Sequence, residues 1–196
     1  MDYIRHIPVE AWSLEEQDQQ IEQALKSIEL VRVSLYKSLT QYRQWEEFAK
    51  DNPNLNKMGL NIEIKEYSDK VKITIPNILP YVRLDHKLND KDYYRKLNTF
   101  YVGEMTKIIQ EKNIKLTFSN AFILIKQYFP DLKIRDFDNQ IKSFIFNALR
   151  YSKLIKDDSW KNLTYMEAGE LCRTHPRTEI IVTDIQKMGD MLKLID

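Results

Sequence analysis

Apolar residues recur at helical spacing in the first quarter of the chain. After Ser13-Leu14-Glu15-Glu16, which has the form of a capping box, the apolar positions advance in alternating steps of four and three, with one interruption at Arg32. These positions are Ile21, Leu25, Ile28, Leu35, Leu39 and Tyr42. The pattern predicts one long amphipathic helix over about residues 14–50, ended by Asp51-Asn52-Pro53-Asn54.

Beyond residue 60 the pattern changes to short strands and helices. Period-two alternation predicts a β-hairpin from residues 62–65 and 71–75, with its turn at 68–70. Further along, the spacing predicts a helix over about 90–112, a buried strand at 121–125, a helix over about 139–151, and strands at 160–168 and 178–184. This order predicts an α+β fold, a mixed small sheet with helices packed on one face. We expect an N-terminal helical extension, residues 1–58, and an α+β domain, residues 59–196.

The composition is that of a globular protein and does not by itself indicate a function. The 196 residues are 43% hydrophobic and 30% charged, as in ordinary globular proteins, and the single cysteine, Cys172, excludes an internal disulfide framework. No run approaches the roughly 18 apolar residues of a membrane span, and no secretory leader is recognisable, so we expect a cytoplasmic protein without a membrane partner. A net charge of only +1 does not by itself indicate nucleic-acid binding.

An acidic cluster is the strongest candidate for chemistry. Asp136 and Asp138 stand two residues apart, so an extended segment would direct both carboxylates to one side. Asp157-Asp158 follows the next predicted helix, and Asp158 could supply a third carboxylate. Such oxygen ligands suit Mg²⁺, with Mn²⁺ as the other candidate, and Lys142 could stabilise charge on a phosphate at the metal. Taken alone, Asp-x-Asp-Asn before a helix is more typical of a cap and turn.

The order of these motifs resembles the RusA-like Holliday-junction resolvases over roughly residues 71–184. The matching motif is Asp136-Phe137-Asp138-Asn139-Gln140-Ile141-Lys142, followed by Asn147-Ala148-Leu149 and Asp157-Asp158; the family usually has Asp-Ala-Leu at the middle triplet. The resemblance implies catalysis by Asp136, Asp138, Asp158 and Lys142, with the three aspartates as metal ligands. It also implies a homodimer that hydrolyses phosphodiester bonds of branched DNA, in the recombination and repair of a phage or mobile element.

Basic residues around the cluster are candidates for DNA contacts. Their side chains could reach phosphates, while Tyr151 and Trp160 could stack on an unpaired base; an ordinary solvated surface explains the same residues equally well. The candidate DNA-binding residues are Lys133, Arg135, Arg150, Lys153, Lys156, Lys161, Arg173 and Arg177.

The apolar stripe of the N-terminal helix leaves two interpretations open. It could form a coiled-coil dimer seam or fold back on its own domain. The second overall hypothesis follows from it: a catalytically weak or inactive binding protein with the same fold, whose N-terminal helix engages a protein partner.

Overall fold

The computed structural model describes residues 14–41, 60–80, 91–133, 137 and 141–195. Its helices are α1 (Leu14–Gln41), α4 (Lys91–Glu111), α5 (Ser143–Tyr151) and α6 (Met188–Leu192), the last preceded by a 3-10 turn at Ile185–Lys187. Its strands are β1 (Glu63–Glu66), β2 (Lys70–Ile75), β3 (Ala121–Phe129), β4 (Leu163–Leu171) and β5 (Arg177–Asp184). None of the described helices is long and apolar enough to cross a membrane.

The strands form one mixed sheet in the order β1-β2-β5-β3-β4. Only β3 and β4 run parallel, and the other neighbours are antiparallel. The parallel pair needs a crossover, which α5 and the segments on either side of it supply. The prediction of an α+β fold with a mixed sheet and an N-terminal helix is confirmed.

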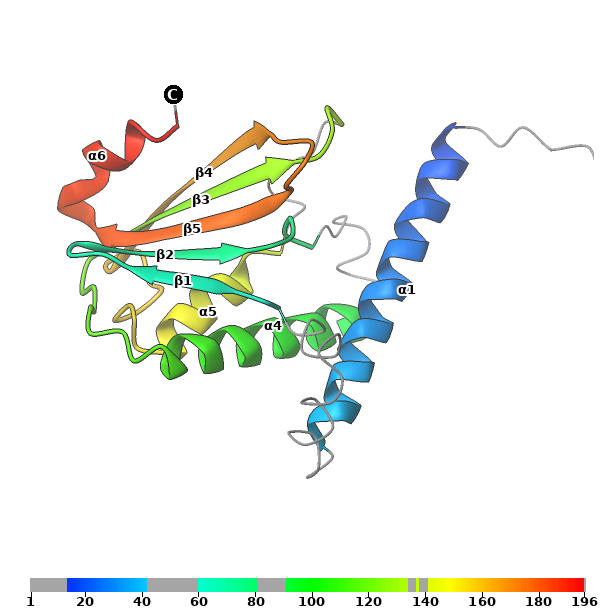
Figure 1. The fold of residues 1–196 in the computed structure, drawn as a ribbon, viewed down its shortest axis with the longest axis horizontal. Helices are drawn as coiled ribbons and strands as arrows, with labels where there is room; N and C mark the ends of the chain where they lie inside the picture. Colours follow the sequence, from blue (N-terminus) through cyan, green and yellow to red (C-terminus); the bar gives the residue numbers. More distant parts are fainter. Residues whose placement is uncertain (1–13, 42–59, 81–90, 134–136, 138–140, 196) are drawn as a thin grey trace, which may run out of the picture.

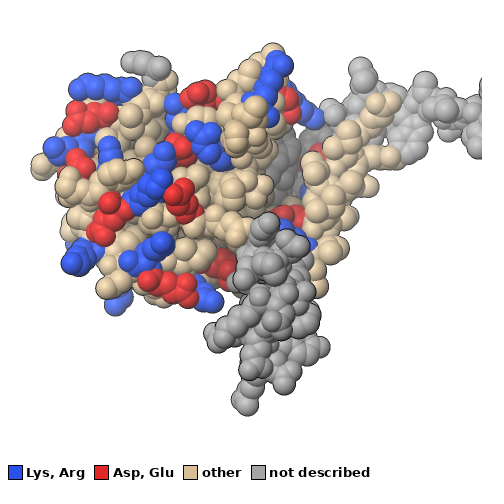
Figure 2. All heavy atoms as spheres, viewed as in Figure 1, with Lys and Arg blue, Asp and Glu red and all other residues tan. Residues whose placement is uncertain are grey.

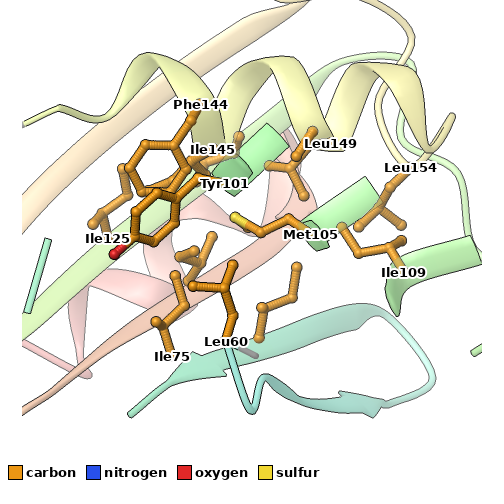
Figure 3. Close-up of a cluster of buried hydrophobic side chains, with 14 of the residues drawn as sticks. Leu60, Ile75, Tyr101, Met105, Ile109, Ile125, Phe144, Ile145, Leu149 and Leu154 are labelled. Carbon is orange, nitrogen blue, oxygen red and sulfur yellow. The ribbon is translucent and has the colours of Figure 1, made fainter. Parts of the chain in front are cut away.

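Alternation along β3 divides the protein into two layers of packing. Ile123 and Ile125 face α4 and α5 and belong to the main core, in which Phe144 of α5 lies 4.5 Å, centroid to centroid, from the ring of Tyr101 of α4 (Figure 3). Phe122 and Leu124, which alternate with them along β3, face the other way and form a smaller cluster with Ile181 of β5 and Met191 of α6. The prediction that the helices pack on one face is therefore wrong for α6, which lies across the sheet from α4 and α5 (Figure 1).

Helix α1 packs on α4 through a polar contact and one buried side chain. The Arg32 guanidinium lies 2.6 Å from Glu29 Oε1 and donates to Tyr101 Oη, which itself donates to the same carboxylate at 3.0 Å. Burial, helped by the nearby Glu29 charge, raises the pKa of Tyr101 and keeps its hydroxyl protonated. Val33 is only 1% exposed. Arg32 therefore joins α1 to the domain, which explains its place in an otherwise apolar stripe.

Most of the other predicted elements are confirmed, with shifted ends. The hairpin and the helix at 90–112 match β1, β2 and α4 closely, whereas β3 continues four residues beyond the predicted strand. Helix α5 begins at Ser143 rather than near 139, and α6 had no prediction. The predicted end of the first helix near residue 50 and the domain boundary after residue 58 lie outside the described residues.

Candidate functional site

Helix α5 buries one face in the core, and its other face is accessible for binding. Its four buried residues are Phe144, Ile145, Ala148 and Leu149. The opposite face carries Phe146, Asn147 and Arg150, with Lys142 at the N-cap. Residues 142, 146 and 150 follow one another at four-residue steps, so their side chains line a single row.

Beside this row runs β4, the edge strand next to α5. Lys142 Nζ forms a short ion pair with Glu167 Oε1 and lies 5.9 Å from the centre of the Tyr165 ring. That ring packs against Phe146 at 5.1 Å between centroids. The Glu167 side chain is only 8% exposed, and its Oε2 atom has no hydrogen-bond partner in the described part of the chain. Lys142 therefore neutralises a nearly buried carboxylate.

Arg150 organises the other end of the row. Its Nη2 donates to Asn147 Oδ1 at 3.2 Å, and its Nη1 lies 3.5 Å from Asp158 Oδ1. The guanidinium carbon also lies 4.9 Å from the centre of the Tyr151 ring. Arg150 Nε is buried without a partner among the described residues. These contacts hold the guanidinium over the helix surface rather than extended into solvent.

The segment from Ser152 to Asn162 follows α5 in the chain, and its Asp158 reaches back to Arg150 of the row. It is tied to the domain by a bridge between Phe118 and Ile155 and by Asn162, whose carbonyl accepts from the Ala121 amide at 2.8 Å. Trp160 is 84% exposed, and Lys161 Nζ lies 5.5 Å from the centre of its ring. The Ser159 hydroxyl, which hydrogen-bonds the Asp157 carboxylate, is the main cause that lowers the pKa of Asp157.

Three exposed aromatic rings thus each have a cation beside them. The pairs are Tyr151 with Arg150, Trp160 with Lys161, and Tyr165 with Lys142. An exposed ring can stack on a nucleobase, and a neighbouring cation can contact a phosphate. We call these six residues, with the exposed Lys153 and Lys156, the α5 surface.

The structure describes only two of the four predicted catalytic residues, and each of them has an ion-pair partner. Asp136 and Asp138 lie outside the described residues, Asp158 is paired with Arg150, and Lys142 is paired with Glu167. No group of three or more His, Cys, Asp or Glu side chains able to hold a metal occurs within the described ranges. The Mg²⁺ or Mn²⁺ site stays a prediction.

The predicted DNA-binding residues are also dispersed. Arg150, Lys153, Lys156 and Lys161 belong to the α5 surface, Arg135 lies outside the described residues, and Lys133 and Arg173 are exposed in loops.

Arg177 lies on the other side of the sheet. Its Nε donates to Glu179 Oε1 at 2.9 Å, and its guanidinium carbon lies 3.5 Å from the centre of the Tyr128 ring. Lys72 Nζ binds the second oxygen of Glu179, also at 2.9 Å. Burial alone would raise the pKa of Glu179, but these hydrogen bonds outweigh burial and hold it below its ordinary value.

Sequence reasoning missed Glu167, Tyr165 and Phe146 as parts of the surface. A signal for the first two existed, because residues two apart in the predicted strand at 160–168 share a face. What the sequence did not contain was the parallel register of β3 and β4, which decides that this face points toward α5.

Comparisons with known proteins assign no family to the chain. No family model and no curated protein matches the chain. Among 14 matching chains of solved structures is the periplasmic domain of Helicobacter pylori MotB, residues 78–256, at 13% identity and a TM-score of 0.34, covering 71% of this chain and 92% of that chain. The 90–256 form of the same domain gives 13% identity and a TM-score of 0.36, covering 71% of this chain and 90% of that one.

These findings correct the function that the sequence predicted. These solved structures are MotB periplasmic domains and not nucleases, and the prediction of a structure-selective endonuclease that resolves Holliday junctions in recombination and repair is wrong. A likeness with a TM-score below 0.5 assigns no function either, and nothing of MotB is carried over. The likeness to the RusA family and the cytoplasmic location are not tested and stay predictions.

Proposed function

We propose that the protein binds DNA that exposes unpaired bases, and that the α5 surface is its binding site. The observation that carries the proposal is the set of three exposed rings, Tyr151, Trp160 and Tyr165, each with a cation within 5.9 Å of its centre. The proposal concerns binding alone.

The geometry favours single strands over duplex. The rings stand on a helix end, a loop and an edge strand and are 47% to 84% exposed, so bases that are not already stacked in a helix can reach them. A continuous duplex hides its base faces and would offer only phosphates to the few lysines of this surface. The near-neutral net charge of +1 therefore agrees better with stacking than with binding driven mainly by phosphate contacts.

The charges of the surface predict a weak dependence on salt. The exposed Lys153, Lys156 and Lys161 have no described ion pair, whereas Lys142 and Arg150 are each held by a carboxylate. If three cations meet phosphates of a single strand, log K falls with log salt at a slope of about −2, because each contact contributes roughly −0.7.

The test is fluorescence anisotropy with a labelled oligothymidylate of about 16 nucleotides and with a labelled duplex of equal length. We expect tighter binding of the single strand and a salt slope near the value above. Replacing Lys153 and Lys156 by Gln is expected to reduce the slope by about 1.4. The matched control replaces Lys65 and Lys70 of the β1–β2 hairpin, at the other edge of the sheet, and is expected to leave it unchanged. Equal binding of both ligands, or no binding of the single strand at low salt, would refute the proposal.

A further inference from the structure

Helix α1 has two faces, and only one of them is used by its own domain. Glu29, Arg32 and Val33 turn toward α4. On a helix with 3.6 residues per turn, Val33 lies about 120° around the axis from Ile21. The residues around Ile21 are exposed and so are not covered by the domain, and α1 itself lies at the side of the molecule (Figure 1).

That outer face is apolar over four turns. Its exposed fractions are 58% for Ile21, 61% for Leu25, 63% for Ile28, 65% for Val31 and 40% for Leu35. We call these five residues the α1 stripe. A contiguous row of large apolar side chains on a soluble protein marks an interaction surface, whereas single exposed residues do not.

The spacing within the α1 stripe is symmetric. The steps from Ile21 to Leu35 are four, three, three and four, so Ile28 lies at the centre. If two copies of α1 lay antiparallel about a two-fold axis at Ile28, Ile21 would meet Leu35 of the other copy and Leu25 would meet Val31. Ile28 would meet its own copy. A self-complementary row of this kind fits an isologous interface.

One flank of the stripe carries no charge that would oppose such pairing. In a two-fold interface each charge lies near an identical one, so a charged flank would repel itself. On one flank of the stripe α1 carries Gln20 and Ser27, and Ala24 lies between the stripe residues. The other flank carries Asp18, Glu22 and Glu29, of which Glu29 is paired with Arg32, the one charged residue within the arc of the stripe. Figure 2 shows the viewed side of α1 as largely free of Lys, Arg, Asp and Glu. Small uncharged side chains also permit close approach of a second helix.

From these observations we infer that the occupant of the α1 stripe is the α1 stripe of a second copy, and that the protein is an antiparallel α1 dimer. The inference is independent of DNA binding, because the α5 surface and the α1 stripe share no residue.

The first test is sedimentation velocity of the full chain over a range of concentrations. A monomer has a mass of 23.5 kDa, and we expect a reversible shift to twice that mass. Ile28→Asp places two carboxylates at the axis and is expected to weaken association at least about 100-fold. Its matched control is Gln23→Asp, an exposed position on the opposite side of α1 from the stripe, which is expected to change little. A monomer at every concentration would overturn the inference.

The second test reports on direction. In a Cys172→Ser background, Ile28→Cys is expected to form a disulfide between copies, because the two positions meet at the axis within reach of such a bond. Leu35→Cys is expected to form none. In the antiparallel pair position 35 lies level with position 21 of the other copy, which is 14 helical residues, or about 21 Å, from position 35 of that copy. Cross-linking through position 35, with or without cross-linking through 28, would contradict the antiparallel arrangement. Both positions are exposed, so circular dichroism should show that the variants fold.

Discussion

Trp160 gives the sharpest prediction about the α5 surface. It is the most exposed large apolar residue described, at 84%, compared with 54% for Tyr151 and 47% for Tyr165. Its ring therefore has the largest free face to stack on a base. Replacing Trp160 by Ala is expected to weaken oligothymidylate binding more than replacing either tyrosine.

The magnitude follows from what one stacked base contributes. Alanine substitution of a stacking ring costs about 1–3 kcal/mol, which corresponds to a loss of roughly 5- to 150-fold in affinity. Because the Trp160 side chain is nearly free of the fold, its removal should leave the free energy of unfolding within about 0.5 kcal/mol of wild type. Tyr165 differs, since its ring packs on Phe146 and its loss also affects stability.

The assay is a titration by fluorescence anisotropy, with urea unfolding of the same samples. Tyr67→Ala is the matched control, because Tyr67 is 44% exposed and has Lys70 beside its ring, 5.6 Å from the centre, yet lies in the hairpin at the opposite edge of the sheet. Equal affinity of Trp160→Ala and wild type would refute the stacking argument. So would an equal loss in Tyr67→Ala, which would mean that binding does not depend on the α5 surface.

Three further predictions concern the fold that holds this surface. Gly169→Ala brings a Cβ within 2.9 Å of the Phe129 ring and should lower the free energy of unfolding by about 1–3 kcal/mol in urea unfolding. Gly103 lies in α4 with open space where its Cβ would stand, so Gly103→Ala should raise the free energy of unfolding by up to about 1 kcal/mol. Lys142→Met leaves the nearly buried Glu167 without its cation and should cost about 3–5 kcal/mol, most of it recovered when Glu167→Gln is added; no recovery would contradict the pairing. The pKa of Glu179 is lowered in the folded state, so the stabilisation from its ionised carboxylate is present above the ordinary value of 4.5 and is lost as pH falls below that value. Glu179→Gln should therefore flatten the acid limb of a profile of unfolding free energy against pH, measured by urea unfolding. An unchanged acid limb would contradict this.

The pattern of apolar residues was sufficient to predict the local elements of the fold. Alternation in the hairpin and helical spacing in α4 depend on neighbours in sequence, so β1, β2 and α4 followed directly. The end of α5 at Tyr151 also agrees with the predicted end. Its start was not, because Ile141 is fixed by a tertiary hydrogen bond from its amide to the carbonyl of Pro80 and not by a local cap.

Contacts between distant segments explain the remaining differences. Arg32 interrupts an apolar stripe in the sequence, and only Tyr101, 69 residues away, gives it a reason. In the same way, the pairing of Lys142 with Glu167 depends on the crossover from β3 to β4, which spacing alone does not define. The sequence alone predicts a phosphate contact for Lys142, because the carboxylate that neutralises it lies 25 residues further along the chain.

Hydrogen–deuterium exchange of the full chain, with and without saturating oligothymidylate, locates the DNA-binding site without any substitution. Slowed exchange should be concentrated in α5, the 152–162 segment and β4, and the β1–β2 hairpin should exchange as before. Protection confined to other elements, or none at a concentration where anisotropy shows binding, would contradict the assignment of the α5 surface as the DNA-binding site.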